Sequence, residues 1–233
     1  MNAKRGYVPE DERYFSAEAV EIMRKASEHV CYLINEGYGL KQATTFVGNH
    51  FLLSERQRLA VMRSVATEEQ LFQRKEKELG LEKIAGKRIW IDGFNTIITL
   101  EVMLSGSLLF LGMDGAIRDL AALRGTYRLI PETTAAVTMM LDVLKAAEVS
   151  SAIILLDEPV SNSGRLKARI ADLGEEYPFS LDIRIQKDVD KTLYQQEHVI
   201  TSDSIVLDQC RSWVNLTGEC LKRTGAEVLR VFG

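Results

Sequence analysis

The segment of residues 87–95, Lys-Arg-Ile-Trp-Ile-Asp-Gly-Phe-Asn, constrains the fold more than any other part of the chain. Its apolar run, residues 89–91, is too short for a helix and ends at Asp92 and Gly93, a pattern typical of a strand buried on both faces. Open α/β sheets bind ligands at the carboxyl ends of such strands. Asp92 is therefore a candidate site residue, although it could simply cap the next element.

The N-terminal third carries the signals of helix starts. Ser16 can cap a first helix, and two capping boxes follow, one at residues 54–57 and one at residues 67–70. We therefore predict an α-helical domain over residues 1–82.

Two roles are open for this helical domain. The helices on either side of Gly48 and Asn49 could form a helix-turn-helix in which Arg56, Arg58 and Arg63 face phosphate. Most short helix pairs are packing units, however, so a docking module or a homo-oligomer interface is the favoured interpretation.

Residues 83–233 alternate between strand and helix patterns. We expect strands at 89–91, 151–156, 181–185, 199–201 and 227–232, and helices at 132–147, 162–173, 189–197 and 204–210. Residues 96–104 and 107–112 suggest a hairpin, with a buried helix as the competing interpretation. The alternation predicts an α/β fold, with a mainly parallel sheet flanked by helices on both faces.

Composition limits the class of protein. No apolar run approaches the roughly 20 residues of a membrane span, and the charged N-terminus does not resemble a signal peptide, so we expect a cytoplasmic protein. The three cysteines are widely spaced, which suggests neither a disulfide framework nor a zinc site. The net charge of −4 does not exclude a nucleic-acid partner, because carboxylates that hold cations contribute to it.

Two enzyme classes lack their motifs. Residues 153–159, Ile-Ile-Leu-Leu-Asp-Glu-Pro, resemble the Walker B strand of ATPases, but no suitable phosphate loop is present. The chain also has no Gly-x-Ser-x-Gly segment of the kind that carries a nucleophilic serine.

Acidic residues follow several of the expected strands. They are Asp92, Asp157, Asp190 and Asp203, with Asp208 near one turn further on. Parallel strands deliver their carboxyl ends to one edge of the sheet, so these carboxylates should converge there. Like charges repel at short range unless a cation or a proton intervenes. Oxygen ligands without clustered His or Cys indicate a hard ion, Mg²⁺ or Mn²⁺.

These segments resemble the motifs of the PIN/NYN-like metal-dependent ribonucleases. Residues 89–95 are similar to the opening strand motif of that superfamily, and residues 199–208 to its late Thr-Ser-Asp motif. Residues 188–193 resemble the Ala-Asp segment of the NYN branch. The helical N-terminal domain followed by a PIN-like half also resembles a little-characterised archaeal family.

The resemblance implies a role for each matching position. Asp92, Asp190 and Asp203 would bind the metal, Asp208 would be a fourth catalytic acid, Asn95 would orient Asp92 or a water, and Asp157 would support them. The superfamily places a further acid between Asn95 and Thr133, where Asp119 competes with Glu101 and Asp114.

The implied activity is hydrolysis of phosphodiester bonds in RNA, with Mg²⁺ or Mn²⁺ as cofactor. The candidates for binding the nucleic-acid backbone are Arg165, Lys167, Lys187 and Lys191, although a solvated helix face would carry the same residues. The alternative is a PIN-like protein without catalytic activity that serves as an RNA-binding or scaffolding subunit.

Overall fold

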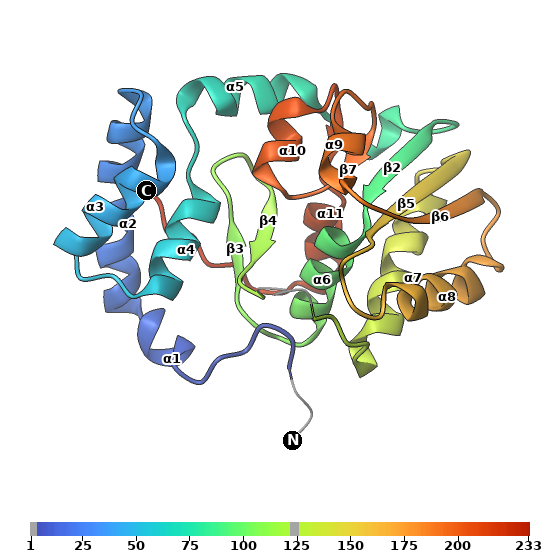
Figure 1. Cartoon of the computed structure of the whole chain (residues 1–233), viewed down its shortest axis with the longest axis horizontal. Coiled ribbons are helices and arrows are strands. Elements are labelled where there is room, and N and C mark those ends of the chain that lie inside the picture. The colour runs from blue at the N-terminus through green and yellow to red at the C-terminus, as the bar shows by residue number, and fades with distance from the viewer. Residues whose placement is uncertain (1–3, 122–125) are drawn as a thin grey trace.

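The computed structural model describes residues 4–121 and 126–233 and shows a helical region followed by an α/β region (Figure 1). The helices are α1 (Asp11–Tyr14), α2 (Ala17–Asn35), α3 (Leu40–His50), α4 (Glu55–Ser64), α5 (Glu68–Lys77), the 3-10 helix η1 (Leu81–Lys83), α6 (Gly93–Leu104), α7 (Pro131–Ala146), α8 (Ser163–Gly174), α9 (Val189–Leu193), α10 (Ser204–Gln209) and α11 (Leu216–Thr224). The strands are β1 (Glu78–Leu79), β2 (Arg88–Asp92), β3 (Leu109–Leu111), β4 (Ile117–Asp119), β5 (Ser151–Asp157), β6 (Ser180–Gln186), β7 (Val199–Ile200) and β8 (Trp213–Val214). Within these residues, no helix combines the length and the apolar composition that crossing a bilayer requires.

The helices of the N-terminal region begin where the sequence predicts. Ser16 accepts a hydrogen bond from the backbone of α2, and both capping boxes form, at Ser54 with Gln57 and at Thr67 with Gln70. Each box satisfies backbone N–H groups that the first turn of a helix leaves without partners.

Six parallel strands form the central sheet, in the order β1-β8-β7-β2-β5-β6. From β2 the chain proceeds through β5 to β6 on one side and then returns to β7 and β8 on the other. The order of the strands therefore reverses at β2, and the carboxyl ends of strands at such a point form the ligand-binding crevice of open α/β sheets. The predicted parallel sheet with flanking helices is confirmed.

Helices cover both faces of this sheet because successive side chains of each strand point to opposite sides. Ile89, Ile91 and Ile154 pack into a core with α6, α7 and α8. Trp90 and Leu155 belong to a second core on the α9 and α10 side.

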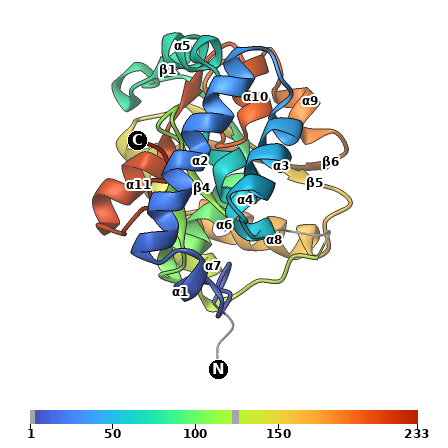
Figure 2. The same cartoon turned by 90° about the vertical axis from the view of Figure 1, so that its left-hand side faces the viewer.

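The helical region shares buried contacts with the α/β region. Phe110 and Val231 are fully buried in the core of α2–α4, and the indole N–H of Trp213 donates to the backbone oxygen of Arg74 at 2.8 Å. Figure 2 shows α2 and α4 lying in front of β4. The boundary expected near residue 82 therefore separates two stretches of sequence that pack against each other.

Of the two interpretations of residues 96–104, the hairpin strand is wrong and the buried helix is correct, because these residues belong to α6. Ten of the twelve residues of α6 are buried. A helix buried on nearly all sides lacks the amphipathic period, so its apolar and β-branched run looks like a strand. The antiparallel hairpin is formed instead by β3 and β4.

Two further expected elements are shorter in the structure. The helix expected at 189–197 ends at Leu193, and the strand expected at 227–232 is reduced to one bridge between Leu229 and Phe110. Residues 227–232 are tied to the helical region instead, where the Ser27 hydroxyl donates to the backbone oxygen of Val231 at 2.6 Å.

Candidate functional site

Asp92 ends β2 and immediately precedes α6. A Cβ atom at the next position, Gly93, would lie 2.6 Å from the backbone oxygen of Leu155 on β5. Only glycine fits that approach, so it allows the helix to start directly against the sheet. Asp92 is thereby held at the carboxyl edge, next to the point where the strand order reverses.

The carboxylate of Asp92 does not cap α6. Asp92 occupies the N-cap position, but its side chain accepts no capping hydrogen bond. Its Oδ2 accepts instead from the hydroxyl of Thr201, at 2.8 Å, at the end of the neighbouring strand β7. The capping alternative therefore fails for Asp92.

Asn95 holds the turn that follows β7. Its Oδ1 accepts from the backbone N–H of Ser202 at 2.7 Å, from the Ser202 hydroxyl at 3.0 Å and from the Thr201 hydroxyl at 3.3 Å. The residue expected to orient Asp92 thus orients the segment that contacts Asp92.

Four carboxylates act on one another at this edge. Burial raises the pKa of Asp92 to about 8, the hydrogen bond from Thr201 opposes the rise, and the charges of Asp190, Asp203 and Asp157 add to it. Burial and the charges of Asp203 and Asp157 also raise the pKa of Asp190. The structure therefore brings these four predicted acids within electrostatic range of one another.

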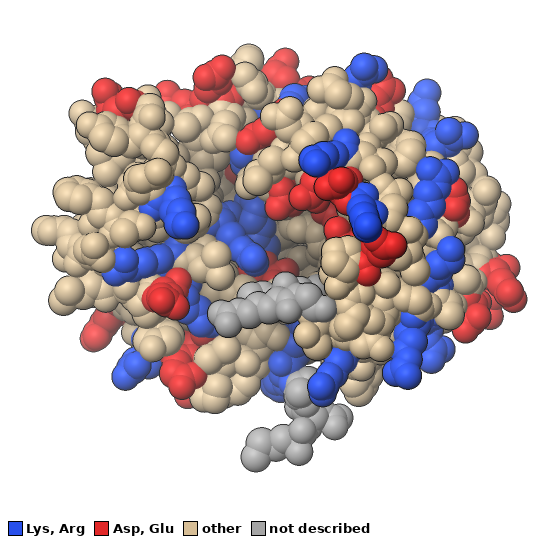
Figure 3. Space-filling model, viewed as in Figure 1, with Lys and Arg blue, Asp and Glu red and all other residues tan. Residues whose placement is uncertain are grey.

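The acids differ in exposure, so the group has a buried end and an open end. Asp92 is 5% exposed, Asp157 and Asp203 are half-buried, and Asp190 is exposed. Figure 3 shows acidic side chains gathered just below α9 and β7, beside a hollow whose other side, toward β3 and β4, shows basic side chains. A ligand can approach the group from this face.

Within residues 4–121 and 126–233, no lysine or arginine forms an ion pair with any of the four carboxylates. In the same residues, no three His, Cys, Asp or Glu side chains are arranged closely enough to hold a metal ion on their own. The group is crowded and acidic, but it is not a ready three-ligand site.

Asp208, expected as a fourth catalytic acid, is engaged elsewhere. Its carboxylate accepts from Arg74 at 2.7 Å and from Gln70 at 2.8 Å, both on α5. Asp203 caps α10, and a helix advances about 100° per residue, so a side chain five positions later points about 140° away. Asp208 therefore faces the helical region rather than the other acids.

The three candidate acids between Asn95 and Thr133 are also bound elsewhere. The buried carboxylate of Glu101 accepts from Tyr127, Thr133 and Arg5, Asp114 pairs with Arg74 and Arg118, and Asp119 accepts from Thr99 and from the backbone of Ala121. None of the three is among the charges that raise the pKa of Asp92. Asp119, expected as a supporting residue, therefore bonds to groups that stabilise the fold and lies outside the group of four acids.

An arginine network behind the late motif was not foreseen from the sequence. Arg118 donates from Nε to the backbone oxygen of Ser202 at 2.8 Å, and Arg74 donates to that of Ser204 at 3.3 Å. Both guanidinium groups share the carboxylate of Asp114. The turn that carries Asp203 is thus fixed by Asn95 on one side and by this network on the other.

The basic residues expected to bind nucleic acid lie on the surface. Lys187 pairs with Glu158 at 3.6 Å and Lys191 with Asp188 at 3.3 Å, all four exposed, while Arg165 and Lys167 are exposed on α8. The arginines of the possible helix-turn-helix differ, because Arg56, Arg58 and Arg63 form hydrogen bonds within the protein, to Asp11, Asn49 and Asp119 respectively. These three arginines hold parts of the chain together and do not form a set of side chains that faces phosphate.

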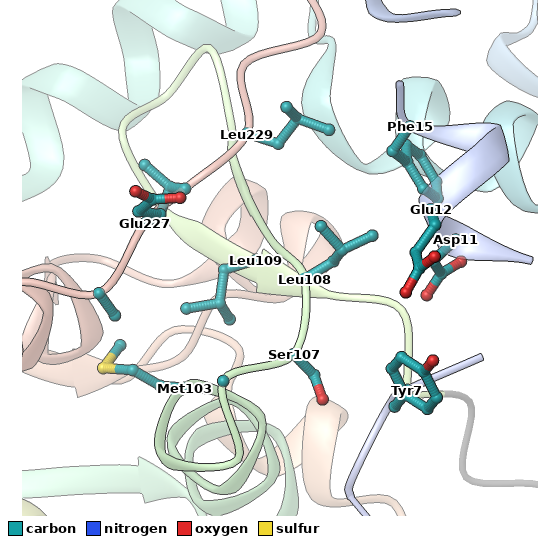
Figure 4. Close-up of a pocket in the computed structure, with 13 residues that line it drawn as sticks. Tyr7, Asp11, Glu12, Phe15, Met103, Ser107, Leu108, Leu109, Glu227 and Leu229 are labelled. Atoms are coloured by element: carbon teal, nitrogen blue, oxygen red, sulfur yellow. The ribbon is translucent and has the colours of Figure 1, made fainter. Parts of the chain in front are cut away.

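A cavity of about 520 Å³ lies elsewhere, between the N-terminal segment and residues 226–229 (Figure 4). Leu108, Leu109 and Leu229 face this space, while Asp11 and Glu12 lie at one end. Its lining includes none of the four acids at the sheet edge, so the cavity is separate from them.

Comparisons with known proteins match nearly the whole chain. The model of the family described as "Domain of unknown function (DUF5616)" matches residues 81–219, and that of "Protein of unknown function (DUF434)" matches residues 22–77. "Uncharacterized protein MJ0935" of Methanocaldococcus jannaschii is 33% identical over 202 residues, which cover 86% of this chain and 97% of the relative. No solved structure gives a significant match.

Proposed function

We propose that this chain, which belongs to the family described as a domain of unknown function (DUF5616), is a metal-dependent nuclease that hydrolyses phosphodiester bonds in RNA. The observation that supports this most is the position of Asp92, which is buried at the end of β2, has no paired cation among the described residues, and feels the charges of Asp157, Asp190 and Asp203. Such a concentration of negative charge needs a proton or a cation to offset it. The resemblance to the PIN/NYN-like ribonucleases supports RNA as the substrate.

The donor set fits a hydrated hard cation. Mg²⁺ is usually bound by only one or two carboxylates and keeps several waters, so a site without three converging protein ligands is compatible with it. Asp92, Asp190 and Asp203 would hold the ion, one or two of them directly and the rest through its bound waters. When bound, such an ion activates a water and stabilises the negative charge that develops on the phosphate.

Hydrogen bonds fix the carboxylates of Asp92 and Asp203 in place. The Thr201 hydroxyl holds Oδ2 of Asp92, and Oδ1 of Asp203 accepts two backbone N–H groups of α10, at 2.8 Å from Ile205 and 3.1 Å from Val206. Each carboxylate therefore keeps one oxygen that these bonds do not use. Asp157 would contribute charge rather than direct contact.

The pKa of Asp92 makes cation binding dependent on pH. Below about 8 the carboxyl group holds a proton in the absence of a cation, and a cation must displace that proton. Affinity should therefore increase with pH up to about 8 and then level off.

Substrate would be held by the exposed basic residues around the acids. Lys187 and Lys191 lie beside the acid-bearing segments, and their ion pairs are exposed and weak, so phosphate can compete for them. Arg165 and Lys167 on α8 would extend the contact along the nucleic-acid backbone.

The test is thermal unfolding with increasing MnCl₂ or MgCl₂, followed by cleavage assays on single-stranded and structured RNAs. A cation at a hundredfold excess over its Kd stabilises the folded state by about 2.7 kcal/mol, which raises Tm by roughly 5–10 °C in a protein of this size. Asp92→Asn and Asp203→Asn should abolish both the shift and the cleavage. Asp142→Asn is the matched control, because this exposed aspartate lies on α7 and bonds only to Tyr177 among the described residues.

The opposite outcome favours the non-catalytic alternative. A wild-type protein that shows neither cation-dependent stabilisation nor cleavage would be an RNA-binding or scaffolding subunit. Cleavage that survives in Asp92→Asn would place the activity at another site.

A further inference from the structure

A further cavity, of about 370 Å³, lies at the opposite edge of the sheet. Its lining comes from three segments: Arg88 and Trp90 in the first half of β2, residues 195–198, which lead into β7, and Arg211, which lies before β8. These strands are parallel, so all three segments are at their amino ends. Asp92 ends β2 and lies at the other edge, so this cavity is distinct from the acidic group.

The cavity has an aromatic wall formed by Trp90, which is half-buried. The guanidinium of Arg184 lies 5.8 Å from the centre of the Trp90 ring, but Arg184 does not line the cavity. Among the hydrogen bonds of the described residues, none uses the indole N–H of Trp90 as donor. The wall therefore offers an aromatic surface and an unused donor.

Two cations stand beside this wall. Arg88 and Arg211 are exposed, and neither forms an ion pair in residues 4–121 and 126–233. Glu197 is the acid in the lining, so the charges of the lining sum to a positive excess. Figure 3 shows basic side chains along the side of the molecule where Figure 1 draws β2 and β5.

The segment between α9 and β7 is held by the backbone around it. The backbone N–H of Gln195 donates to the backbone oxygen of Gln209 at 3.1 Å, and the backbone N–H of Arg211 donates to that of Gln196 at 2.8 Å. The backbone N–H of His198 donates to the Ser212 hydroxyl at 2.8 Å. These bonds fix the position of the lining before any ligand arrives, which lowers the entropic cost of binding.

We propose that this cavity binds a nucleotide unit, with the base stacked on Trp90 and the phosphate held by Arg88 and Arg211. Bases stack on aromatic side chains without regard to sequence, and arginine forms paired hydrogen bonds with phosphate oxygens. Gln196 supplies polar contacts for the base edge or the ribose. The ligand is either a free nucleoside monophosphate or an unpaired nucleotide of a single strand.

Tryptophan fluorescence tests the proposal directly. The chain has two tryptophans, and Trp213 is fully buried, so a response to added ligand reports Trp90. The full-length protein is titrated in EDTA, which removes any contribution from divalent cations, with AMP, UMP, adenosine, inorganic phosphate and a single-stranded pentanucleotide. We expect saturable quenching by the monophosphates, and binding at least tenfold weaker for adenosine and for phosphate. Tighter binding of the pentanucleotide than of AMP would identify a strand as the source, and the reverse a free nucleotide.

Calorimetry on variants separates stacking from charge. Trp90→Leu should weaken AMP binding about tenfold because it removes the stacking surface, and Arg211→Ala should weaken it about tenfold because it removes a cation that holds the phosphate. Arg223→Ala, which removes an exposed arginine on α11, is the matched control and should change nothing.

Three results would overturn the proposal: no saturable response to any nucleotide, equal affinity for phosphate and AMP, or unchanged binding in Arg211→Ala. Asp92→Asn distinguishes this site from the nuclease site, since it should abolish cation-dependent effects and keep AMP binding. Loss of AMP binding in Asp92→Asn would place the nucleotide at the acids and also contradict the proposal.

Discussion

Asp92 and Asp114 have buried carboxylates in opposite electrostatic surroundings. Burial and, to a smaller extent, the charges of three neighbouring aspartates together raise the pKa of Asp92 to about 8. Burial would also raise the pKa of Asp114, but the charges of Arg118 and Arg74 outweigh it and hold that pKa below its ordinary value.

The difference separates a structural carboxylate from a candidate functional one. A buried charge is tolerated when it is paired and hydrogen-bonded, and Asp114 has both arginines within 2.8 Å. Among the described residues, the carboxylate of Asp92 accepts a single hydrogen bond, from Thr201, and its charged neighbours are other acids. The negative charge of Asp92 must therefore be neutralised by a proton or by a bound cation.

The two regions are nevertheless joined. The same arginines that neutralise Asp114 donate to the backbone oxygens of Ser202 and Ser204, on either side of Asp203. Arg74 belongs to α5, so the helical region contributes directly to the position of an acid at the sheet edge. This contact gives the N-terminal helices a role in the site itself.

Replacing Arg74, the arginine that pairs with Asp114, should have the largest effect on stability. Arg74 is 3% exposed and pairs with Asp114 and Asp208, so Arg74→Met leaves Asp208 without a cation and Asp114 with Arg118 alone, and should lower the free energy of unfolding by about 3–5 kcal/mol. Urea unfolding measures the change. Arg24→Ala, which breaks the exposed pair with Glu21, is the control and should cost less than about 1 kcal/mol. Equal losses in the two variants would show that the buried network is not structural.

Removing the acid from the other region should change how stability depends on pH. The pKa of Asp92 is about 8 in the folded protein, against an ordinary value of 3.8, so between these pH values the folded state holds a proton that the unfolded state releases. In EDTA, this group should therefore lower the free energy of unfolding by about 1.4 kcal/mol for each pH unit of increase between pH 5 and 7. Asp92→Asn should lack that decline, so the variant gains stability relative to wild type as pH rises.

Urea unfolding at pH 5, 6, 7 and 8 checks this dependence, with Asp142→Asn as the exposed control. Parallel curves for wild type and Asp92→Asn would contradict the raised pKa. The contribution of Asp114 runs in the other direction, because its pKa is lowered, and it should be lost only as pH falls below about 4.

The sequence predicts the parallel sheet and the strand ends well because those signals are local. Residues 89–91 and 151–156 are short apolar runs that end at acids, and both form strands of the central sheet. The capping boxes at Ser54 and Thr67 are equally local, since each involves residues three positions apart. Helix α6 could not be distinguished from a strand by the sequence, because a helix buried on most sides shows no period.

The sequence could not predict which residues far apart in the chain form ion pairs and hydrogen bonds with one another. Asp208 follows the late motif and looks like a site residue until its partner Arg74, 134 positions away, is known. Asp114 and Asp119 likewise look equivalent to Asp92 as acids, and only the structure shows which of them is neutralised within the protein. The cavity at Trp90 draws on three separate segments, and no single motif marks it.

Asp203 provides the smallest and most selective test, because it combines both kinds of role. Its Oδ1 caps α10, as a structural aspartate does, while its charge acts on Asp190 and Asp92. Asp203→Ala removes the cap and should lower the free energy of unfolding by about 1 kcal/mol, whereas Asp203→Asn keeps a capping oxygen and should stay within about 0.5 kcal/mol of wild type. Both variants should lose cation-dependent stabilisation, measured as the Tm shift with MnCl₂. A full Tm shift in Asp203→Asn would assign this residue to the structural class alone and leave Asp92 and Asp190 as the cation ligands.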